Sequence, residues 1–304
     1  MAAAITFPPY LKKGNTIGIV CPAGFMPAEK TLQCRKTLEQ WGFRVKLGAT
    51  VGNSFHYFSG TDAERLADMQ AMLDDENIHA ILCGRGGYGC SRIIDQLDWK
   101  KFRKHPKWII GFSDITVFHN FLYTKQKTAS LHAAMANAFN NGGDKKEYVL
   151  TLRNALIGKK NTYKIAPHTM NRTGAATGVL LGGNLSILAH QTGTISDINT
   201  RGAILFIEDV GEYLYNIDRM LLQLDRAGKL QHLAGLIVGG FSDMKDTTTS
   251  FGKTVEEIIQ ERISNYSFPV CFGFPVSHEE ENVALKVGAV YALKVGKTVQ
   301  LKEV

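Results

Sequence analysis

Short apolar, β-branched runs alternate with helix-like stretches through the first 140 residues of this 304-residue chain. We predict strands and intervening helices in turn, with strands at residues 16–20, 43–47, 78–83 and 108–111 and helices at residues 28–41 and 61–73. Thr61, with Glu64 three residues later, predicts a capping box at the start of the second helix. Such alternation is typical of a parallel sheet covered by helices and predicts an α/β fold.

The sequence changes in character after about residue 140. Residues 151–176 include a polar stretch with little periodicity, which we interpret as a linker. Further strands and helices follow it, with strands at residues 178–181, 203–207 and 236–239, helices at residues 217–227 and 254–264, and an alternating tail at residues 287–301 that predicts antiparallel hairpins. We therefore expect an N-terminal domain at residues 1–150 and a smaller, strand-rich α/β domain at residues 177–304.

Charge and composition narrow the class of protein. Hydrophobic residues make up 44% and charged residues 21%, which is ordinary for a globular protein. The net charge is +7. The basic residues occur in scattered pairs such as Lys12–Lys13 and Lys159–Lys160, and no run reaches five like charges. We therefore expect no nucleic-acid partner, while the positive charge suits an anionic small substrate.

The sequence predicts a cytoplasmic protein. Its first residues lack the basic and apolar regions of a signal peptide, and no apolar stretch is long enough to span a membrane, so no membrane association is expected. The cysteines are odd in number and lack metal-site or disulfide-framework spacing, which predicts free thiols in a reducing compartment: Cys21, Cys34, Cys83, Cys90 and Cys271. We also expect no metal or other cofactor, since no HExxH or paired His/Cys spacing occurs.

Ser113 is the sharpest local feature. The apolar strand that ends at Gly111 is followed by Phe112, Ser113 and the start of a helix. A serine at such a turn has the setting of a nucleophile elbow, although the sequence is not GxSxG. Capping of the helix by Ser113 is the simpler alternative, and the local sequence leaves both open.

A glycine-rich turn follows the strand at residues 78–83. The sequence Gly84-Arg85-Gly86-Gly87 matches neither GxGxxG nor a P-loop, so a phosphate site is not supported. Its backbone could nevertheless approach a ligand closely, or the glycines could simply form a tight turn. In an α/β sheet this turn and Ser113 would lie at the same carboxyl edge.

A serine nucleophile needs a base, and the base needs an orienting acid. Of the nine histidines, His278 is distinctive because it follows a strand end and precedes a polar loop. Glu208 and Asp209 close the apolar run at residues 203–207. Spacing alone does not join Ser113, Glu208 and His278.

Five blocks of sequence, in order, resemble the LD-carboxypeptidase family of serine peptidases. They are Arg85-Gly86-Gly87-Tyr88-Gly89, Gly111-Phe112-Ser113-Asp114-Ile115-Thr116, Leu181-Gly182-Gly183-Asn184-Leu185, Phe206 to Glu212 with Ile217-Asp218-Arg219, and Phe274-Pro275-Val276-Ser277-His278. The resemblance runs from Thr16 to the end of the chain. It implies a flavodoxin-like or class I amidotransferase-like N-terminal domain.

The resemblance also implies a catalytic triad of Ser113, His278 and Glu208. The oxyanion hole would consist of the backbone amides of Asp114, Gly86 and Gly87. Arg85 is our candidate for binding the terminal carboxylate of the substrate, with Tyr88 beside it. The nucleophile would come from the first domain and the acid and base from the second, so the site would lie between them.

The family's substrate is a murein tetrapeptide, from which a terminal D-Ala is released during cell-wall recycling in the cytoplasm. A related branch cleaves aminoacyl-nucleotide or acyl-sulfamate antibiotics of the microcin C type on the same triad. Tyr213 and Tyr215 could stack on a nucleotide, but no Trp occurs after residue 108, and we favour the tetrapeptide. The resemblance further implies a homodimer. A non-catalytic module that binds an anionic peptide remains the alternative from another class, whereas amidotransferase chemistry would need a cysteine where Ser113 stands.

Overall fold

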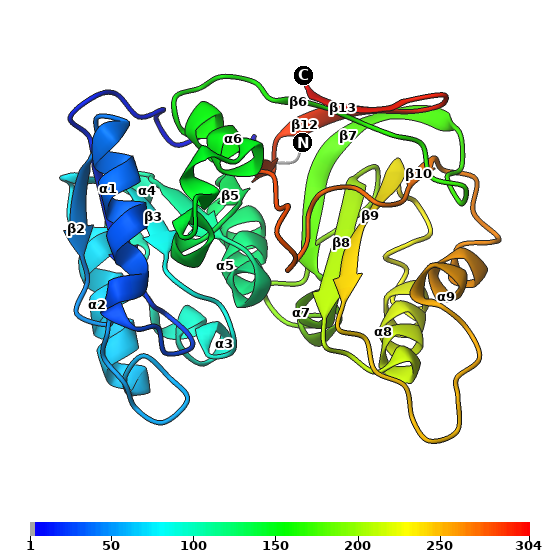
Figure 1. Ribbon diagram of the computed structural model, residues 1–304, viewed down its shortest axis with the longest axis horizontal. Coiled ribbons are helices and arrows are strands. Elements are labelled where there is room, and N and C mark those ends of the chain that lie inside the picture. The colour runs from blue at the N-terminus through cyan, green and yellow to red at the C-terminus, as the bar shows by residue number, and fades with distance from the viewer. Residues whose placement is uncertain (1–3) are drawn as a thin grey trace. The chain divides into compact units, whose positions relative to one another are not determined.

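The computed structural model describes residues 4–304, which divide into two compact units (Figure 1). Unit 1 runs to Lys159 and also includes Val283–Lys286, whereas unit 2 holds Lys160–Asn282 and Val287–Val304. Residues 151–176, where we expected a linker, contain the end of a helix, an edge strand and the start of a long strand. The chain therefore enters unit 2 at Lys160 and returns to unit 1 for four residues near its end.

Unit 1 is built on a mostly parallel sheet. Its strands are β1 (Thr16–Val20), β2 (Arg44–Leu47), β3 (Ile78–Cys83), β4 (Trp108–Gly111), β5 (Ser130–His132) and β11 (Leu285–Val287). They follow the order β11-β5-β4-β3-β1-β2, and β1–β2, β1–β3, β3–β4 and β4–β5 are parallel pairs. The order β2-β1-β3-β4-β5 is that of flavodoxin-like folds, which bind ligands where strand order reverses at the carboxyl ends of β1 and β3. The predicted α/β class is confirmed.

The helices of unit 1 connect these strands. They are α1 (Leu32–Gln40), α2 (Asp62–Asp74), α3 (Cys90–Ile93), α4 (Lys100–Lys104), α5 (Thr116–Phe121) and α6 (Glu147–Leu156), with short turns at Ala28–Thr31, Ile94–Gln96, Ser113–Ile115, Leu122–Gln126, Ala136–Phe139 and Gly143–Lys145. The predicted capping box begins α2, where Glu64 donates its amide to Thr61 Oγ1 and Glu64 Oε2 accepts the Thr61 amide at 2.7 Å. The helix predicted at residues 28–41 is instead a 3-10 turn followed by α1.

The core of unit 1 lies at its central strands. All residues of β3 except one, and all of β4, are buried, as expected for parallel strands covered on both faces. Each fully buried Ile, Leu or Val there stabilises the fold by roughly 1.5–3 kcal/mol. In both units the cysteines are free, as predicted, and all of them are buried.

Unit 2 contains a mixed sheet. Its strands are β6 (Thr162–Ile165), β7 (Gly174–Asn184), β8 (Ile204–Val210), β9 (Gly235–Ser242), β10 (Val270–Cys271), β12 (Val290–Val295) and β13 (Val299–Glu303). The order is β10-β9-β8-β7-β12-β13-β6. The β10–β9, β9–β8 and β8–β7 pairs are parallel, and the β7–β12, β12–β13 and β13–β6 pairs are antiparallel. The hairpin predicted for the tail is confirmed as β12–β13.

The long strand β7 joins the two halves of this sheet. Its residues 174–179 pair with β12 in the antiparallel part, and its residues 180–184 pair with β8 in the parallel part. Gly182 lies opposite Phe206 so closely that a Cβ on it would be 2.0 Å from the Phe206 carbonyl oxygen. Glycine is therefore required where β7 passes β8.

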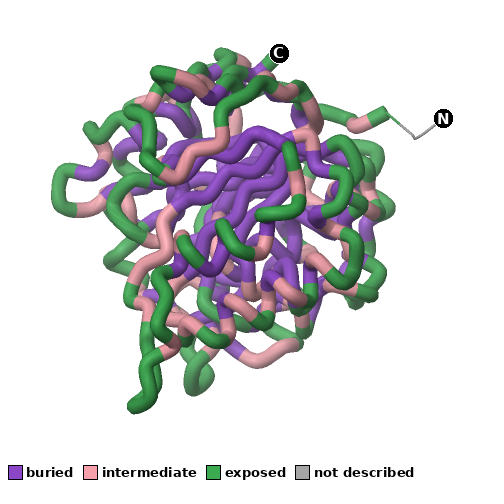
Figure 2. Tube along the Cα trace, turned by 90° about the vertical axis from the view of Figure 1, so that its right-hand side faces the viewer, coloured by how far each residue is buried: buried purple, intermediate pink, exposed green. Residues whose placement is uncertain are grey.

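The helices of unit 2 follow strands of the parallel part: α7 (Leu185–His190), α8 (Leu214–Arg226) and α9 (Val255–Arg262). A second capping box, made by Thr254 and Glu257, begins α9. Buried strands surrounded by exposed loops are visible in Figure 2, and β8 is buried over all but its last residue. No helix within residues 4–304 is long and apolar enough to cross a membrane.

Candidate active site

Ser113 lies at a sharp turn between β4 and α5. Its backbone φ is +63°, in the left-handed region that residues other than glycine rarely adopt. At the end of β4, a Cβ on Gly111 would lie 2.7 Å from Ile115 Cγ1, so the chain turns too tightly there for a larger residue. A strained serine at a strand-to-helix turn is the geometry of a nucleophile elbow.

Helix capping, the simpler role for Ser113, is not what the structure shows. A capping serine accepts a hydrogen bond from an amide two or three residues later. Here the Ile115 amide donates to the Phe112 carbonyl at 3.2 Å, and the Thr116 amide donates to the carbonyls of Asp114 and Ser113. Phe112 occupies the cap position of the turn Ser113–Ile115, so capping does not explain the Ser113 hydroxyl.

The glycine turn after β3 touches Ser113. A Cβ on Gly86 would lie 2.8 Å from Ser113 Cβ and 3.1 Å from its Oγ, so a side chain at this position would collide with the serine. The Gly86 carbonyl accepts the Gly24 amide at 3.0 Å, which ties the loop after β1 to the same place. Gly87 has a φ of +102°. The loops that follow β3 and β4 therefore meet at the carboxyl edge of the sheet, as predicted, and the loop that follows β1 joins them there.

Arg85 and Tyr88 flank this turn and are exposed. Arg85 Nη1 donates to the Phe25 carbonyl at 2.6 Å, which fixes one side of the guanidinium. Tyr88 leaves 47% of its surface exposed, and its ring centroid lies 6.0 Å from that of Phe58. Both side chains are thus anchored beside the turn, and their role in substrate binding stays a prediction.

Asp114, whose amide is a predicted oxyanion donor, also places a buried carboxylate beside the glycine turn. The residue is 1% exposed, and its Oδ2 accepts the amide of Cys90, the first residue of α3, at 2.8 Å. Burial raises the pKa of the Asp114 carboxyl, although this hydrogen bond and the charge of Arg65 act in the opposite direction. No local sequence pattern indicates a role for this carboxylate.

His119, one turn along α5, forms a hydrogen bond with the last residue of β4. It is fully buried, with Nε2 2.9 Å from the Gly111 carbonyl oxygen and Nδ1 2.8 Å from Ser130 Oγ. A carbonyl only accepts, so Nε2 carries the proton and Nδ1 accepts the Ser130 hydroxyl. Burial lowers the pKa of His119 to about 4, which keeps the ring neutral. Nothing in the sequence distinguishes His119 from the other histidines.

Acid is expected to destabilise unit 1 through His119. In the unfolded chain this group binds a proton below its ordinary pKa of 6.5, whereas in the folded chain it does so only near pH 4. Protons therefore favour the unfolded chain between these values, and up to about 3 kcal/mol of stability is lost as the pH falls from 6.5 to 4. Urea unfolding across this range should show a shallower loss in His119→Gln. The exposed His232→Gln should match the wild type, and equal slopes in all three proteins would contradict the prediction.

Glu208 and His278, the predicted acid and base, come together in unit 2. Glu208 Oε2 lies 2.6 Å from His278 Nδ1, and the Glu208 side chain is 0% exposed and that of His278 17%. Because a carboxylate only accepts, Nδ1 of the neutral ring carries the proton and Nε2 holds the lone pair. Burial alone would lower the pKa of His278, but the hydrogen bond and charge of Glu208, with Asp209, raise it above 6.5.

Local backbone features place the two residues. The register between β8 and β9 shifts between Ile207 and Asp209, at the position of Glu208. Behind it, a Cβ on Gly239 would lie 3.2 Å from Glu208 Cβ and 2.2 Å from the Val276 carbonyl oxygen, which lets the loop carrying His278 approach β9. Within that loop Ser277 Oγ accepts the Glu279 amide at 3.0 Å and donates to the Glu281 carbonyl at 3.1 Å.

Asp209 forms a second buried carboxylate beside the pair. Its Oδ1 accepts Asn184 Nδ2 at 2.8 Å, and its Oδ2 accepts the Ser186 amide at 2.9 Å. Asn184 lies directly opposite Glu208 in the β7–β8 pairing and also caps α7. Burial raises the pKa of Asp209 to about 6 despite these hydrogen bonds. Asn184 belongs to one of the family-like sequence blocks and Asp209 follows Glu208, but no role was predicted for either residue.

The structure therefore assembles the predicted residues in two groups. Ser113, Asp114 and the turn of Gly86 and Gly87, with Arg85 and Tyr88 beside it, belong to unit 1. Glu208 and His278 belong to unit 2. Among residues 4–304, no group of three or more His, Cys, Asp or Glu side chains is arranged to hold a metal ion.

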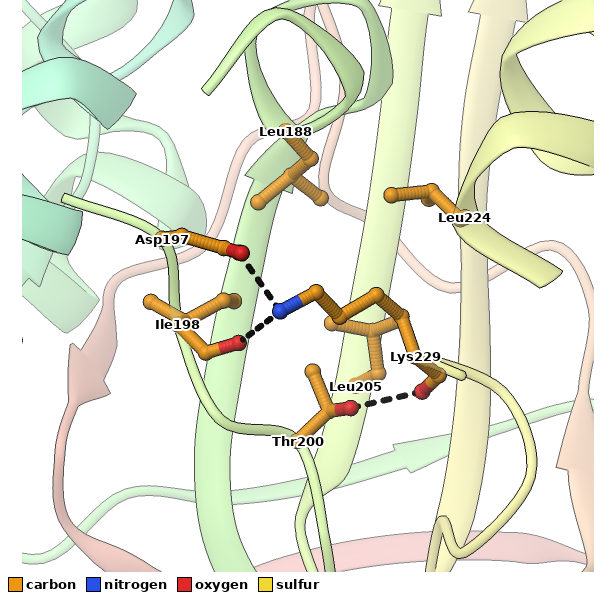
Figure 3. A pocket seen from close by; sticks show the side chains of 7 residues that line it. All are labelled: Leu188, Asp197, Ile198, Thr200, Leu205, Leu224 and Lys229. Atoms are coloured by element: carbon orange, nitrogen blue, oxygen red, sulfur yellow. Dashed lines mark hydrogen bonds and ion pairs between the residues drawn. The ribbon is translucent and has the colours of Figure 1, made fainter. Parts of the chain in front are cut away.

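A small cavity in unit 2 is lined by Leu188, Asp197, Ile198, Thr200, Leu205, Leu224 and Lys229 (Figure 3). Its charged groups pair with each other, since Lys229 Nζ lies 2.6 Å from Asp197 Oδ1 and 2.8 Å from the Ile198 carbonyl oxygen. Thr200 Oγ1 donates to the Lys229 carbonyl at 2.6 Å. These bonds attach the loop before β8 to the turn that follows α8, which is a structural role.

Two models of one family match the chain. Residues 17–133 match the LD-carboxypeptidase N-terminal domain, and residues 177–293 match the LD-carboxypeptidase C-terminal domain. A probable murein peptide carboxypeptidase of Bacillus subtilis (strain 168) is 34% identical over 293 residues, which cover 95% of this chain and 92% of that protein.

Solved structures agree with these matches. The crystal structure of muramoyltetrapeptide carboxypeptidase from Oxalobacter formigenes has a TM-score of 0.84 and 29% identity, covering 95% of this chain and 98% of that one. The microcin C7 self immunity protein MccF, in complex with aspartyl sulfamoyl adenosine, has a TM-score of 0.85 over 99% of both chains. At 22% sequence identity, this structural similarity shows that the two proteins share a fold.

Proposed function

Because the chain belongs to the LD-carboxypeptidase family, we propose that it is a serine-type murein tetrapeptide carboxypeptidase that releases a terminal D-alanine. The names of its relatives support a murein peptide as substrate. The observation that carries a serine mechanism is the left-handed turn of Ser113 in contact with Gly86. A backbone of this kind costs of order 1–3 kcal/mol, which capping does not explain and a nucleophile does.

In this proposal Ser113 Oγ attacks the carbonyl carbon of the L,D-peptide bond. Nε2 of His278 accepts the Ser113 proton, because Nδ1 already donates to Glu208. The Glu208 carboxylate holds this tautomer and stabilises the imidazolium that forms. The raised pKa of His278 supports this role, since it reflects a ring whose protonated form the protein stabilises.

The attack places negative charge on the carbonyl oxygen. Backbone amides of Gly86, Gly87 and Asp114 would stabilise this oxyanion, and removing one such donor typically lowers a rate by about 100- to 1,000-fold. When the C–N bond breaks, His278 gives its proton to the amine of the leaving D-alanine. Water, activated by the same histidine, then hydrolyses the ester on Ser113.

Recognition of the terminal carboxylate is assigned to Arg85, with Tyr88 beside it. The guanidinium is exposed yet held by the Phe25 carbonyl at 2.6 Å, so it loses little freedom on binding an anion. The net charge of +7 also favours an anionic peptide.

The test is incubation with the tetrapeptide L-Ala-γ-D-Glu-L-Lys-D-Ala and with its diaminopimelate form. D-alanine and the tripeptide should appear by mass, while the diastereomer that ends in L-Ala should stay intact. An aminoacyl-sulfamoyl nucleotide is run in parallel. Cleavage of that compound alone would assign the protein to the microcin-type branch, and binding of the tetrapeptide without any product would make it a binding module.

A further inference from the structure

One peptide group near Ser113 lies between two buried charges. The Gly89 carbonyl accepts Arg65 Nη1 at 3.0 Å, and the amide of the same peptide group, that of Cys90, donates to Asp114 Oδ2 at 2.8 Å. Arg65 is 0% exposed and Asp114 is 1% exposed. The cation and the anion thus hold the two ends of one peptide dipole, and hydrogen bonds to charged groups are the stronger kind.

Arg65 is itself immobilised. Its Nη1 also donates to the Pro22 carbonyl at 2.5 Å, its Nε donates to the Gly60 carbonyl at 3.3 Å, and it pairs with Asp62. Its guanidinium lies 4.8 Å over the centroid of the Phe58 ring. Such a side chain acts as a fixed reference point to which the Gly89 carbonyl is attached.

Glycine at position 89 makes this contact possible. Its φ is +143°, and a Cβ there would lie 2.6 Å from Arg65 Nη1 and 3.2 Å from Ala23 Cα. Asp114, on the other side, is the neighbour of Ser113 in the chain. The Gly89–Cys90 peptide group therefore connects the end of the glycine turn to the residue next to the nucleophile.

We infer that Asp114 and Arg65 are positioning residues, which set the Gly86–Gly87 turn against Ser113 by holding the Gly89–Cys90 peptide from both sides. This inference rests on the proposed function, because it assigns a purpose to the spacing between the nucleophile and the amides that would bind the oxyanion. That spacing matters only when charge develops on the oxygen. Loss of the Arg65 or Asp114 contact with this peptide group therefore lowers kcat and leaves KM nearly unchanged.

The substitution Asp114→Asn keeps the shape and one acceptor oxygen but removes the charge. We expect kcat for D-alanine release to fall roughly 10- to 100-fold with KM changed less than about threefold, because misplacement by 1 Å can cost 100-fold. The rate at which a fluorophosphonate labels Ser113 should fall by the same factor, since its phosphoryl oxygen occupies the same position as the oxyanion.

The matched control is Asp68→Asn. Asp68 is also buried in unit 1 and accepts backbone amides, those of Ala49 and Thr50 at 3.0 and 2.9 Å, but it does not contact the glycine turn. Its variant should lose thermal stability and keep kcat and the labelling rate within about twofold. Equal catalytic losses in the two variants would overturn the inference, because general loosening would then explain them.

A double-mutant cycle with Arg65→Lys gives a second line of evidence. Lysine retains the charge but not the fork that reaches several carbonyls, so this variant should also be labelled roughly 10-fold more slowly. Together with Asp114→Asn the losses should be less than multiplicative, because both residues act on one peptide. Multiplicative losses, or unchanged labelling in both single variants, would overturn the inference. Labelling of the wild type without D-alanine release would instead refute the proposed substrate alone.

Discussion

Replacing Ser113 by glycine is expected to abolish D-alanine release and, at the same time, to stabilise the protein. The activity is lost because the attacking Oγ is gone, and removal of such a nucleophile costs about a millionfold in kcat. The stability rises because glycine adopts the φ of +63° without strain. Relief of about 1–3 kcal/mol of strain exceeds the entropy that glycine adds to the unfolded chain, which is about 0.4–1 kcal/mol.

Two further variants separate these effects. Ser113→Ala should be equally inactive but not stabilised, because alanine keeps the Cβ that disfavours this backbone. Lys127→Gly relieves another left-handed residue, at a φ of +50°, on an exposed position that we assign no catalytic role. It should be more stable and fully active. D-alanine is measured with D-amino acid oxidase and stability by urea unfolding, and residual activity in Ser113→Gly would rule out Ser113 as the nucleophile.

The substitution Glu208→Gln is expected to lower kcat by roughly 1,000- to 10,000-fold. Glutamine has the shape of glutamate, but it no longer stabilises the imidazolium and can present its NH2 group to His278 Nδ1, which favours the wrong tautomer. The partner atoms are only 2.6 Å apart and the carboxylate is fully buried, so water does not replace the missing charge.

The pH profile of the same variant is an independent test of the role of Glu208. A base must be unprotonated, so kcat/KM falls as the pH falls through the pKa of His278. Glu208 raises that pKa, and its removal should therefore move the acid limb of the residual activity to lower pH. Glu257→Gln, which alters a capping carboxylate of α9 in the same unit, should leave both kcat and the acid limb of the pH profile unchanged. A limb that moves to higher pH would contradict the assignment.

Local sequence patterns predicted much of the fold because their causes are local. The apolar runs became β1, β3 and β4, and the spacing of Thr61 and Glu64 became the capping box of α2. The position of Ser113 after a strand was also readable. Its left-handed φ was not, because the contact with Gly86 that accompanies it comes from another loop.

The remainder of the site depends on contacts that no local pattern contains. His278 meets Glu208 across 70 residues, and only the family resemblance suggested the pair. Asn184 reaches Asp209 because β7 and β8 are in one register, and Arg65 reaches Gly89 because α2 and the glycine turn approach each other in space. Pairings of this kind follow from the completed sheets.

The return of the chain to unit 1 sets an order of events during synthesis. The edge strand β11 lies beside β5, and the Ala284 amide donates to Thr151 Oγ1 at 2.9 Å. Yet β11 and Ala284 are synthesised only after Lys160–Asn282 of unit 2. Until they leave the ribosome, β5 is an open edge that can pair with other chains. Unit 1 comes first in the sequence, but it is completed only when its last segment, which begins after Asn282, has been made. His278 lies four residues before Asn282, so its loop has then also been made. The nascent protein can thus finish this sheet only once the proposed base is already present.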